Sequence, residues 1–90
     1  HISVYRYGGE EFAVIFHTEP IATAHALLEA WRTAVERRVW REENLHVTFS
    51  AGLGEWHFEP LEHFVGSVDG ALYTAKQQGK NRIVRTSDSE

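Results

Sequence analysis

The sequence of 90 residues contains no cysteine and no run of apolar residues long enough to span a membrane. The first absence excludes disulfide bonds and thiolate metal sites, and it tilts the expected location toward the cytoplasm. The second excludes a membrane-spanning helix within these residues, because such a helix needs roughly 18 to 20 apolar residues. The N-terminus also lacks the pattern of a secretory signal peptide. We therefore expect a cytoplasmic domain, whose parent protein is either free or tethered to a membrane.

An excess of positive charge is also missing, since the formal net charge is −4. A nucleic-acid binder normally carries a basic face, so we expect no polymeric nucleic acid as a partner. The exception is a segment near the C-terminus that holds four basic residues and no acidic one: Lys76, Lys80, Arg82 and Arg85. Such a local patch on an acidic protein suits a small molecule that carries phosphate groups.

The first half of the sequence predicts a hairpin followed by a helix. Two runs of β-branched and aromatic residues, 2–7 and 12–16, flank a Gly-Gly pair, which is typical of a tight turn between antiparallel strands. Apolar residues then recur at three- and four-residue spacing, which predicts a helix to about residue 38: Ile21, Ala24, Leu28, Trp31 and Val35. Arg32 and Glu36 lie one helical turn apart on its polar side, which we interpret as a solvated face.

The second half predicts a strand, a second helix and a short last strand. Residues 45–53 alternate between apolar and polar side chains, as in a strand with one buried face. A second helix begins near Pro60, and Gly79 is placed to end it. Ile83 and Val84 suggest the last strand. The predicted fold is α+β, an antiparallel sheet covered by helices.

The hairpin tip is the most informative stretch for chemistry. Gly8 and Gly9 are followed by the adjacent carboxylates of Glu10 and Glu11, although a turn has no need of paired carboxylates. Hard divalent cations prefer carboxylate oxygens, and glycine permits close approach of the backbone to phosphates. Residue chemistry alone leaves two interpretations open: a metal and phosphate site, or an ordinary turn with two solvated glutamates.

Three motifs follow one another along the sequence. Residues 8–12 read GGEEF, residues 47–53 read VTFSAGL and include a Ser-x-Gly, and residues 69–82 read DGALYTAKQQGKNR. These motifs resemble those of the GGDEF family of diguanylate cyclases. Together they cover the chain from about residue 4 to residue 85. The resemblance implies a fold like that of nucleotidyl cyclases and polymerase palms, and an enzyme that condenses two GTP molecules into cyclic di-GMP.

The resemblance also implies roles for individual residues. Gly8 and Gly9 would lie against the nucleotide. Glu10 would coordinate Mg²⁺ or Mn²⁺ and accept the proton of the attacking 3′-hydroxyl, and Glu11 would support the metal site. Lys76 and Lys80 would contact the phosphates, and their four-residue spacing at a helix end lets the two ammonium groups converge. In the family, arginine is common at the position of Lys80. Lysine lacks the fork of N–H groups with which arginine makes two hydrogen bonds to one phosphate.

The family's domain is longer than this chain, and its N-terminal part supplies a metal-binding aspartate and the guanine contacts. We therefore expect residues 1–90 to be the C-terminal portion of a single GGDEF domain and to be inactive by themselves. The resemblance implies a homodimer for catalysis and an upstream sensor or regulatory domain. Many members carry an inhibitory Arg-x-x-Asp motif whose aspartate would fall at position 2, where this sequence has Ile2.

Two other functional classes compete with an active cyclase. A degenerate GGDEF domain would bind GTP or cyclic di-GMP as a regulatory module, and departures from the signature would indicate it, but residues 8–12 show none. A small interaction domain whose turn only mimics the motif disagrees with the second match at residues 69–82. The histidines lack the H-E-x-x-H pattern and close pairing, so no zinc site is predicted.

Overall fold

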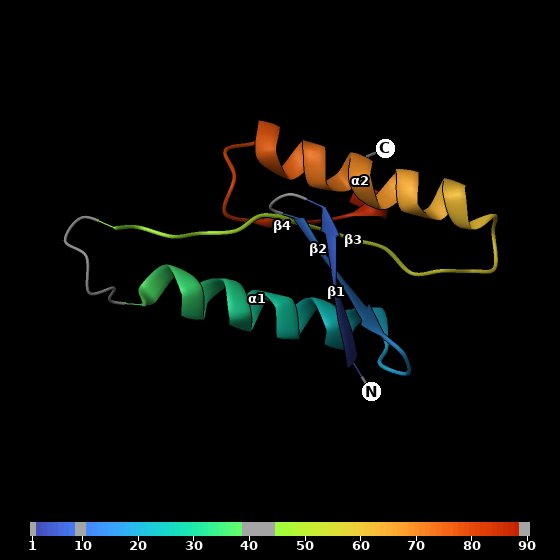
Figure 1. Ribbon diagram of the computed structural model, residues 1–90, viewed down its shortest axis with the longest axis horizontal. Coiled ribbons are helices and arrows are strands. Elements are labelled where there is room, and N and C mark those ends of the chain that lie inside the picture. The colour runs from blue at the N-terminus through green and yellow to red at the C-terminus, as the bar shows by residue number, and fades with distance from the viewer. Residues whose placement is uncertain (1, 9–10, 39–44, 89–90) are drawn as a thin grey trace.

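The computed structural model describes residues 2–8, 11–38 and 45–88, and of residues 3–8, 11, 12 and 88 it describes the backbone. The elements follow the predicted order of hairpin, helix, strand, helix and short strand (Figure 1). Their bounds are β1 Ile2–Gly8, β2 Glu11–Phe16, α1 Ile21–Arg37, β3 Ala51–Leu53, α2 Leu61–Gln77 and β4 Ile83–Arg85, with a final 3₁₀ turn, Thr86–Asp88.

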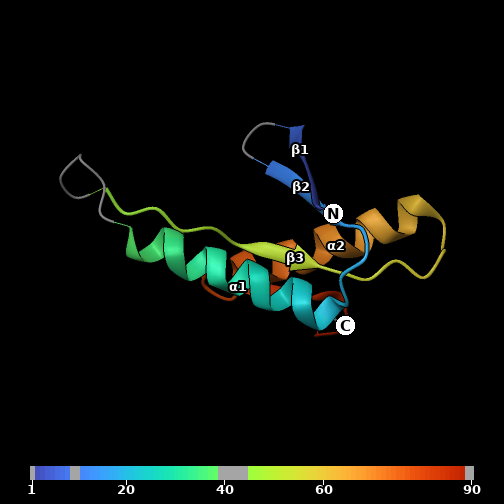
Figure 2. The ribbon, with the colours of Figure 1, turned by 90° about the horizontal axis from the view of Figure 1, so that it is seen from below.

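Strands β1 and β2 form the predicted antiparallel hairpin. Ile2 lies opposite Phe16 at its open end, and Gly8 lies opposite Glu11 at the end near the turn. The register shifts between Arg6 and Gly8, so an irregularity interrupts the ladder just before the signature residues. The hairpin stands off from the layer made by the helices and β3 (Figure 2).

Both helices begin directly after a proline, at Pro20 and Pro60. Proline suits this place because it has no N–H to leave unpaired and its φ is already close to the helical value. Helix α1 turns its apolar stripe inward and buries Ala24 and Leu28. Trp31, at the same stripe, is 39% exposed and stacks on Phe16 with ring centroids 6.0 Å apart.

Gln77 is the last residue of α2, and Gly79, as predicted, closes the helix with a φ of +119°. The N–H of Lys80 donates to the carbonyl of Ala75 at 3.0 Å, and the N–H of Gly79 donates to the carbonyl of Lys76 at 3.4 Å. This pair of bonds is the Schellman motif, in which a glycine closes the helix in the left-handed conformation. The chain therefore leaves α2 in a fixed direction toward β4.

The pairing of β3 and β4 differs from the antiparallel sheet predicted for the whole chain. The two strands pair in parallel, with Ala51 opposite Ile83 and Leu53 opposite Arg85. The reason is the connection, because α2 crosses over between them and returns the chain in the same direction. The prediction of a strand over 45–53 is confirmed only for its last three residues, since β4 offers a ladder of three residues.

Strands β3 and β4 lie between the two helices (Figures 1 and 2). On the α1 side, Ala24 and Leu28 pack with Leu53 of β3. On the α2 side, Ala71 and Ala75 pack with Val84 of β4. The core is thus two small apolar clusters, one on each face of a two-stranded parallel ribbon.

Gly52 permits the closest contact between β3 and α2. A Cβ at Gly52 would lie 2.3 Å from the carbonyl oxygen of Val68 and 2.6 Å from the backbone nitrogen of Leu72. Both atoms belong to the backbone of α2, which cannot move aside as a side chain would. The glycine of the Ser-x-Gly motif is therefore required by packing.

Candidate functional site

The hairpin carries four of the predicted site residues, and the structure describes two of them. Gly8 ends β1 and Glu11 begins β2, and the two form the pair of the ladder closest to the turn. The predicted nucleotide contact at Gly9 and the predicted metal ligand and base at Glu10 lie outside the described residues. The described backbone therefore brings Glu11 opposite a residue without a side chain, at the end of a ladder.

The donor set at this turn fits a divalent metal ion. Glu10 and Glu11 are adjacent carboxylates, and carboxylate oxygens are the ligands that hard cations such as Mg²⁺ prefer. Gly8, opposite Glu11, carries no Cβ, and glycine permits close approach of a ligand to the backbone. Within residues 2–8, 11–38 and 45–88, no group of three or more His, Asp or Glu side chains is placed to hold a metal ion.

Lys76 and Lys80 lie at the C-terminal end of α2. Lys76 is exposed in the last turn, and Lys80 is exposed three residues beyond the helix with a φ of +65°. The helical spacing from which convergence of the two ammonium groups is predicted does not apply, because the helix ends at Gln77. The turn after the helix, and not the helix itself, decides where Lys80 points.

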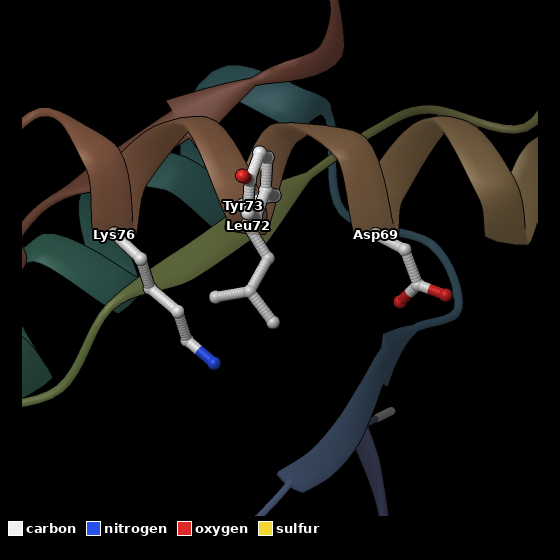
Figure 3. Close-up of a pocket in the computed structure, with 4 residues that line it drawn as sticks. All are labelled: Asp69, Leu72, Tyr73 and Lys76. Carbon is white, nitrogen blue, oxygen red and sulfur yellow. The ribbon is translucent and has the colours of Figure 1, made fainter.

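A shallow hollow of about 250 Å³ lies along α2 and includes Lys76. Asp69, Leu72 and Tyr73 line the rest of it. Asp69, Leu72 and Lys76 project from the same side of the helix, toward the side on which the hairpin lies (Figure 3). The ammonium group at one end suits an anion, whereas the carboxylate of Asp69 at the other end would repel one. Asp69 opens the third motif, but no role is predicted for it from the sequence.

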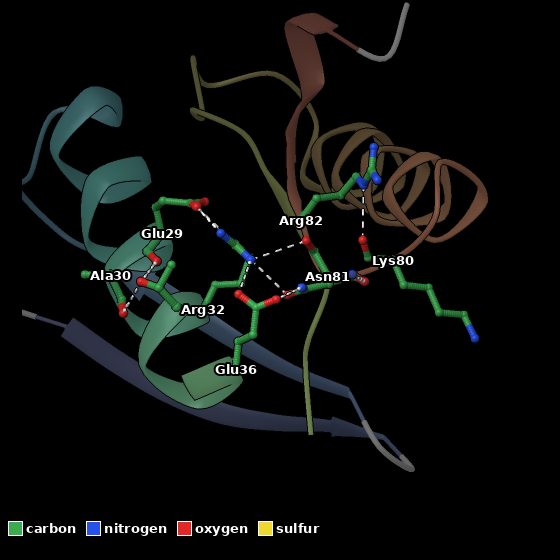
Figure 4. Close-up of polar contacts among 9 residues, drawn as sticks. Glu29, Ala30, Arg32, Glu36, Lys80, Asn81 and Arg82 are labelled. Carbon is green, nitrogen blue, oxygen red and sulfur yellow. Dashed lines mark hydrogen bonds and ion pairs between the residues drawn. The ribbon is translucent and has the colours of Figure 1, made fainter. Parts of the chain in front are cut away.

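Asn81 links this end of α2 to helix α1. Its backbone N–H donates to the hydroxyl oxygen of Ser50 at 3.0 Å. The carboxamide oxygen accepts from Nη1 of Arg32 at 2.9 Å, and the carboxamide nitrogen donates to Oε2 of Glu36 at 2.6 Å (Figure 4). The face of α1 that is interpreted as solvated from the sequence thus makes a specific polar contact across the fold.

Arg32 is held from both sides by carboxylates of its own helix. It pairs with Glu29 and, at 3.5 Å between Nη1 and Oε1, with Glu36. Its side chain is 14% exposed. The hydrogen bond to Glu29 is the main reason that the pKa of Arg32 is raised, and the bond from Arg32 lowers the pKa of Glu29. The pair is therefore charged at neutral pH and weakens only when the pH falls through the lowered pKa of Glu29.

None of the described helices is both long and apolar enough to cross a membrane.

A second hollow of about 320 Å³ opens between the start of α1, the β3–α2 loop and the C-terminal turn, and its lining includes Glu55, His57 and Arg85. Arg85 donates from Nε to Nδ1 of His25 at 2.8 Å, which joins β4 to α1.

Comparison with known proteins places these features in one family. The family model described as "Diguanylate cyclase, GGDEF domain" matches residues 2–82. Diguanylate cyclase A of Treponema denticola is 34% identical over 88 residues, covering 93% of this chain and 24% of that protein. Diguanylate cyclase VdcA of Vibrio cholerae is 34% identical over 89 residues, covering 92% of this chain and 26% of that protein.

The fold is likewise similar to a solved structure of the same family. The GGDEF domain of DgcB from Caulobacter crescentus, crystallised in complex with c-di-GMP, matches with a TM-score of 0.86 and 30% identity. The match covers 96% of this chain and 54% of that one, and the chain spans about a quarter of the curated relatives named above. From its motifs, its fold and these matches, the chain belongs to the GGDEF domain family of diguanylate cyclases.

Proposed function

We propose that residues 1–90 form the C-terminal portion of a GGDEF domain in a diguanylate cyclase, which condenses two GTP molecules into cyclic di-GMP and releases pyrophosphate. The observation that carries the proposal is the unbroken Gly8–Phe12 signature at the β1–β2 hairpin. The same domain also carries the Lys76–Arg82 segment, which runs from the end of α2 toward β4. Family membership and the similarity of the fold to a solved GGDEF domain support the proposal.

The residues of the hairpin tip act on the attacking and leaving groups. Gly8 and Gly9 let the backbone approach the nucleotide, since no Cβ intervenes. A divalent ion, Mg²⁺ or Mn²⁺, held by Glu10 with support from Glu11, would neutralise triphosphate charge and make the 3′-hydroxyl more acidic. Glu10 accepts the hydroxyl proton as the oxygen bonds to the α-phosphorus of the other GTP, and the bond from that phosphorus to pyrophosphate breaks.

The reaction needs two copies of the site, because each GTP supplies the hydroxyl that attacks the other. A homodimer in which each protomer holds one GTP brings the two nucleotides together. In this proposal an upstream sensor or regulatory domain of the parent protein controls that pairing, the domain acts in the cytoplasm, and the chain alone does not catalyse cyclisation. The last point is checked by assaying residues 1–90 beside the full-length protein.

Turnover tests the proposed function. The full-length protein, incubated with GTP and Mg²⁺, is expected to accumulate cyclic di-GMP and to release two pyrophosphates for each product molecule. ATP in place of GTP is the control and is expected to give no cyclic product. A folded, dimeric protein that binds GTP and forms no product would instead identify a regulatory module.

Replacing the basic residues at the end of α2 is expected to weaken GTP binding. Lys76→Gln and Lys80→Gln each remove a charged phosphate contact, so the dissociation constant for GTP rises about tenfold or more in each. Lys80→Arg is expected to tighten binding, because guanidinium offers a bidentate fork to phosphate. Calorimetric titration with a non-hydrolysable GTP analogue measures the dissociation constant. Arg37→Ala is the control, because it removes an exposed cation of α1 outside the proposed site. Unchanged affinity in both lysine variants would contradict a phosphate site here.

Feedback inhibition by the product is expected to be weak or absent. Ile2 stands where the inhibitory motif of many members has its aspartate, and it pairs with Phe16 in the hairpin. An aliphatic side chain cannot replace the hydrogen-bond acceptors and the negative charge of an aspartate. Initial rates with increasing cyclic di-GMP measure the effect, and strong inhibition at micromolar product would contradict the prediction.

A further inference from the structure

The turn that carries Lys80 has an unusual backbone. Gly79, Lys80 and Asn81 all have positive φ values, of +119°, +65° and +49°. Glycine adopts this region without steric conflict between Cβ and the backbone, and asparagine tolerates it, but lysine seldom adopts it. Lys80 is therefore the strained residue, and contacts elsewhere must hold the turn in place.

Helix α1 supplies those contacts through the side chain of Asn81. Nη1 of Arg32 donates to the carboxamide oxygen at 2.9 Å, and Oε2 of Glu36 accepts from the carboxamide nitrogen at 2.6 Å. Nη1 of Arg32 also lies 3.5 Å from the backbone carbonyl oxygen of Asn81. A carboxamide is the side chain that matches this environment, because its acceptor faces the cation and its donor faces the carboxylate.

We propose that Arg32 and Glu36 are positioning residues, which hold Lys80 in place for a phosphate through their clamp on Asn81. This inference rests on the proposed function, in which Lys80 contacts a GTP phosphate. The clamp has a further contact at each end, because Glu29 pairs with Arg32 and the hydroxyl of Ser50 accepts from the Asn81 backbone N–H. The side chain of Lys80 extends away from the clamp and stays available to a ligand (Figure 4).

The clamp on Asn81 acts on Lys80 through the peptide bond that joins these two residues. Any rotation of Asn81 reorients the carbonyl of Lys80, which accepts from Nε of Arg82 at 3.1 Å, and the N–H of Lys80 is tied to Ala75 of α2. Loss of the clamp therefore lets the turn relax toward negative φ and moves the ammonium group. Because misplacement of a charged group by even about 1 Å weakens its action, GTP binding reports the change.

Exchanging donor and acceptor groups tests the clamp. In Asn81→Asp, the new carboxylate faces the carboxylate of Glu36, and we expect the dissociation constant for GTP to rise about tenfold and KM with it. In Asn81→Asp/Glu36→Gln, the new amide donates to one oxygen of the new carboxylate while Arg32 still donates to the other. Affinity is therefore expected to return to within about threefold of the original. The control is Asn81→Asp/Glu62→Gln, which removes the same charge at an exposed, distant position and is expected to restore nothing.

Hydrogen exchange of the backbone amides of Lys80 and Asn81 in the full-length protein is measured alongside binding, since it requires no nucleotide. We expect faster exchange at both in Asn81→Asp and recovery in Asn81→Asp/Glu36→Gln, at a temperature where every variant is folded. Recovery of exchange and affinity together supports positioning. If Lys80→Gln weakens GTP binding and Asn81→Asp does not, the inference alone is overturned. If Lys80→Gln has no effect, the proposed phosphate contact fails and the inference fails with it.

Discussion

Replacement of Gly52 by alanine is expected to lower the free energy of unfolding by about 3 kcal/mol or more, the upper end of the cost of overpacking a core. The new Cβ would lie 2.3 Å from the carbonyl oxygen of Val68 and 2.6 Å from the nitrogen of Leu72. Relief requires β3 and α2 to separate, which opens the contact that connects the two core clusters. For a small domain with a total stability of roughly 5 to 15 kcal/mol, such a loss is severe.

The chain itself offers matched controls for this substitution. Gly66 and Gly70 lie within α2, and a Cβ at either would meet nothing within 4 Å. Alanine there is expected to raise the free energy of unfolding by about 0.5 to 1 kcal/mol, because alanine favours helix. Gly54 is an intermediate case, since an added Cβ would meet Thr86 Cγ2 at 2.9 Å, a side-chain atom that can shift.

Urea denaturation followed by tryptophan fluorescence measures the series. The expected order of stability is Gly70→Ala and Gly66→Ala above the unsubstituted protein, then Gly54→Ala, then Gly52→Ala. A Gly52→Ala protein as stable as the Gly66→Ala protein would show that β3 does not lie against the backbone of α2.

Replacement of Glu10 by alanine is expected to lower the rate of cyclic di-GMP formation by at least about a hundredfold and up to about 10⁴-fold, the range for loss of a general base. In the proposed role the substitution removes two functions at once, because the carboxylate that accepts the proton also holds the metal ion. Glu11→Ala is expected to cost less, since Glu11 supports the site without accepting the proton.

Initial rates of product formation at saturating GTP and Mg²⁺ measure the effect of Glu10→Ala. Glu62→Ala is the control, because Glu62 is an exposed carboxylate in the first turn of α2 and takes no part in the site. Thermal unfolding of each variant checks that it is folded. A Glu10→Ala enzyme with more than about a tenth of the original rate would contradict its role as general base.

The sequence predicted the two helices, the hairpin and the last strand, but it overestimated the strand over 45–53 and missed its parallel pairing, for a physical reason. The stripes of α1 and α2 are set by local spacing, and proline and glycine mark their ends, so each helix could be located from its own residues. The strand over 45–53 was predicted from alternation alone. Whether residues pair depends on a partner far along the chain, and β4 pairs with three residues only, Ala51–Leu53.

In the candidate site, too, local features could be predicted from the sequence and long-range contacts could not. The signature at Gly8–Phe12 and the lysines at the end of α2, Lys76 and Lys80, could be found from motifs, because each motif is a run of consecutive residues. The clamp on Asn81 could not, since its partners lie 49 and 45 residues away on a face that looked solvated. The direction of Lys80 also escaped prediction, because helical spacing was extended to Lys80 although Gly79 was correctly predicted to end α2.

In the proposed function, the hairpin tip and the end of α2 together hold one metal–GTP complex. Mn²⁺ tests it directly, because this paramagnetic ion broadens the resonances of nuclei near it. In the full-length protein with isotope-labelled lysine, Mn²⁺ and a non-hydrolysable GTP analogue together are expected to broaden the signals of Lys76 and Lys80, and Glu10→Ala is expected to remove that broadening. Lysine signals that remain sharp with both ligands bound, or that broaden equally in Glu10→Ala, would contradict a single site.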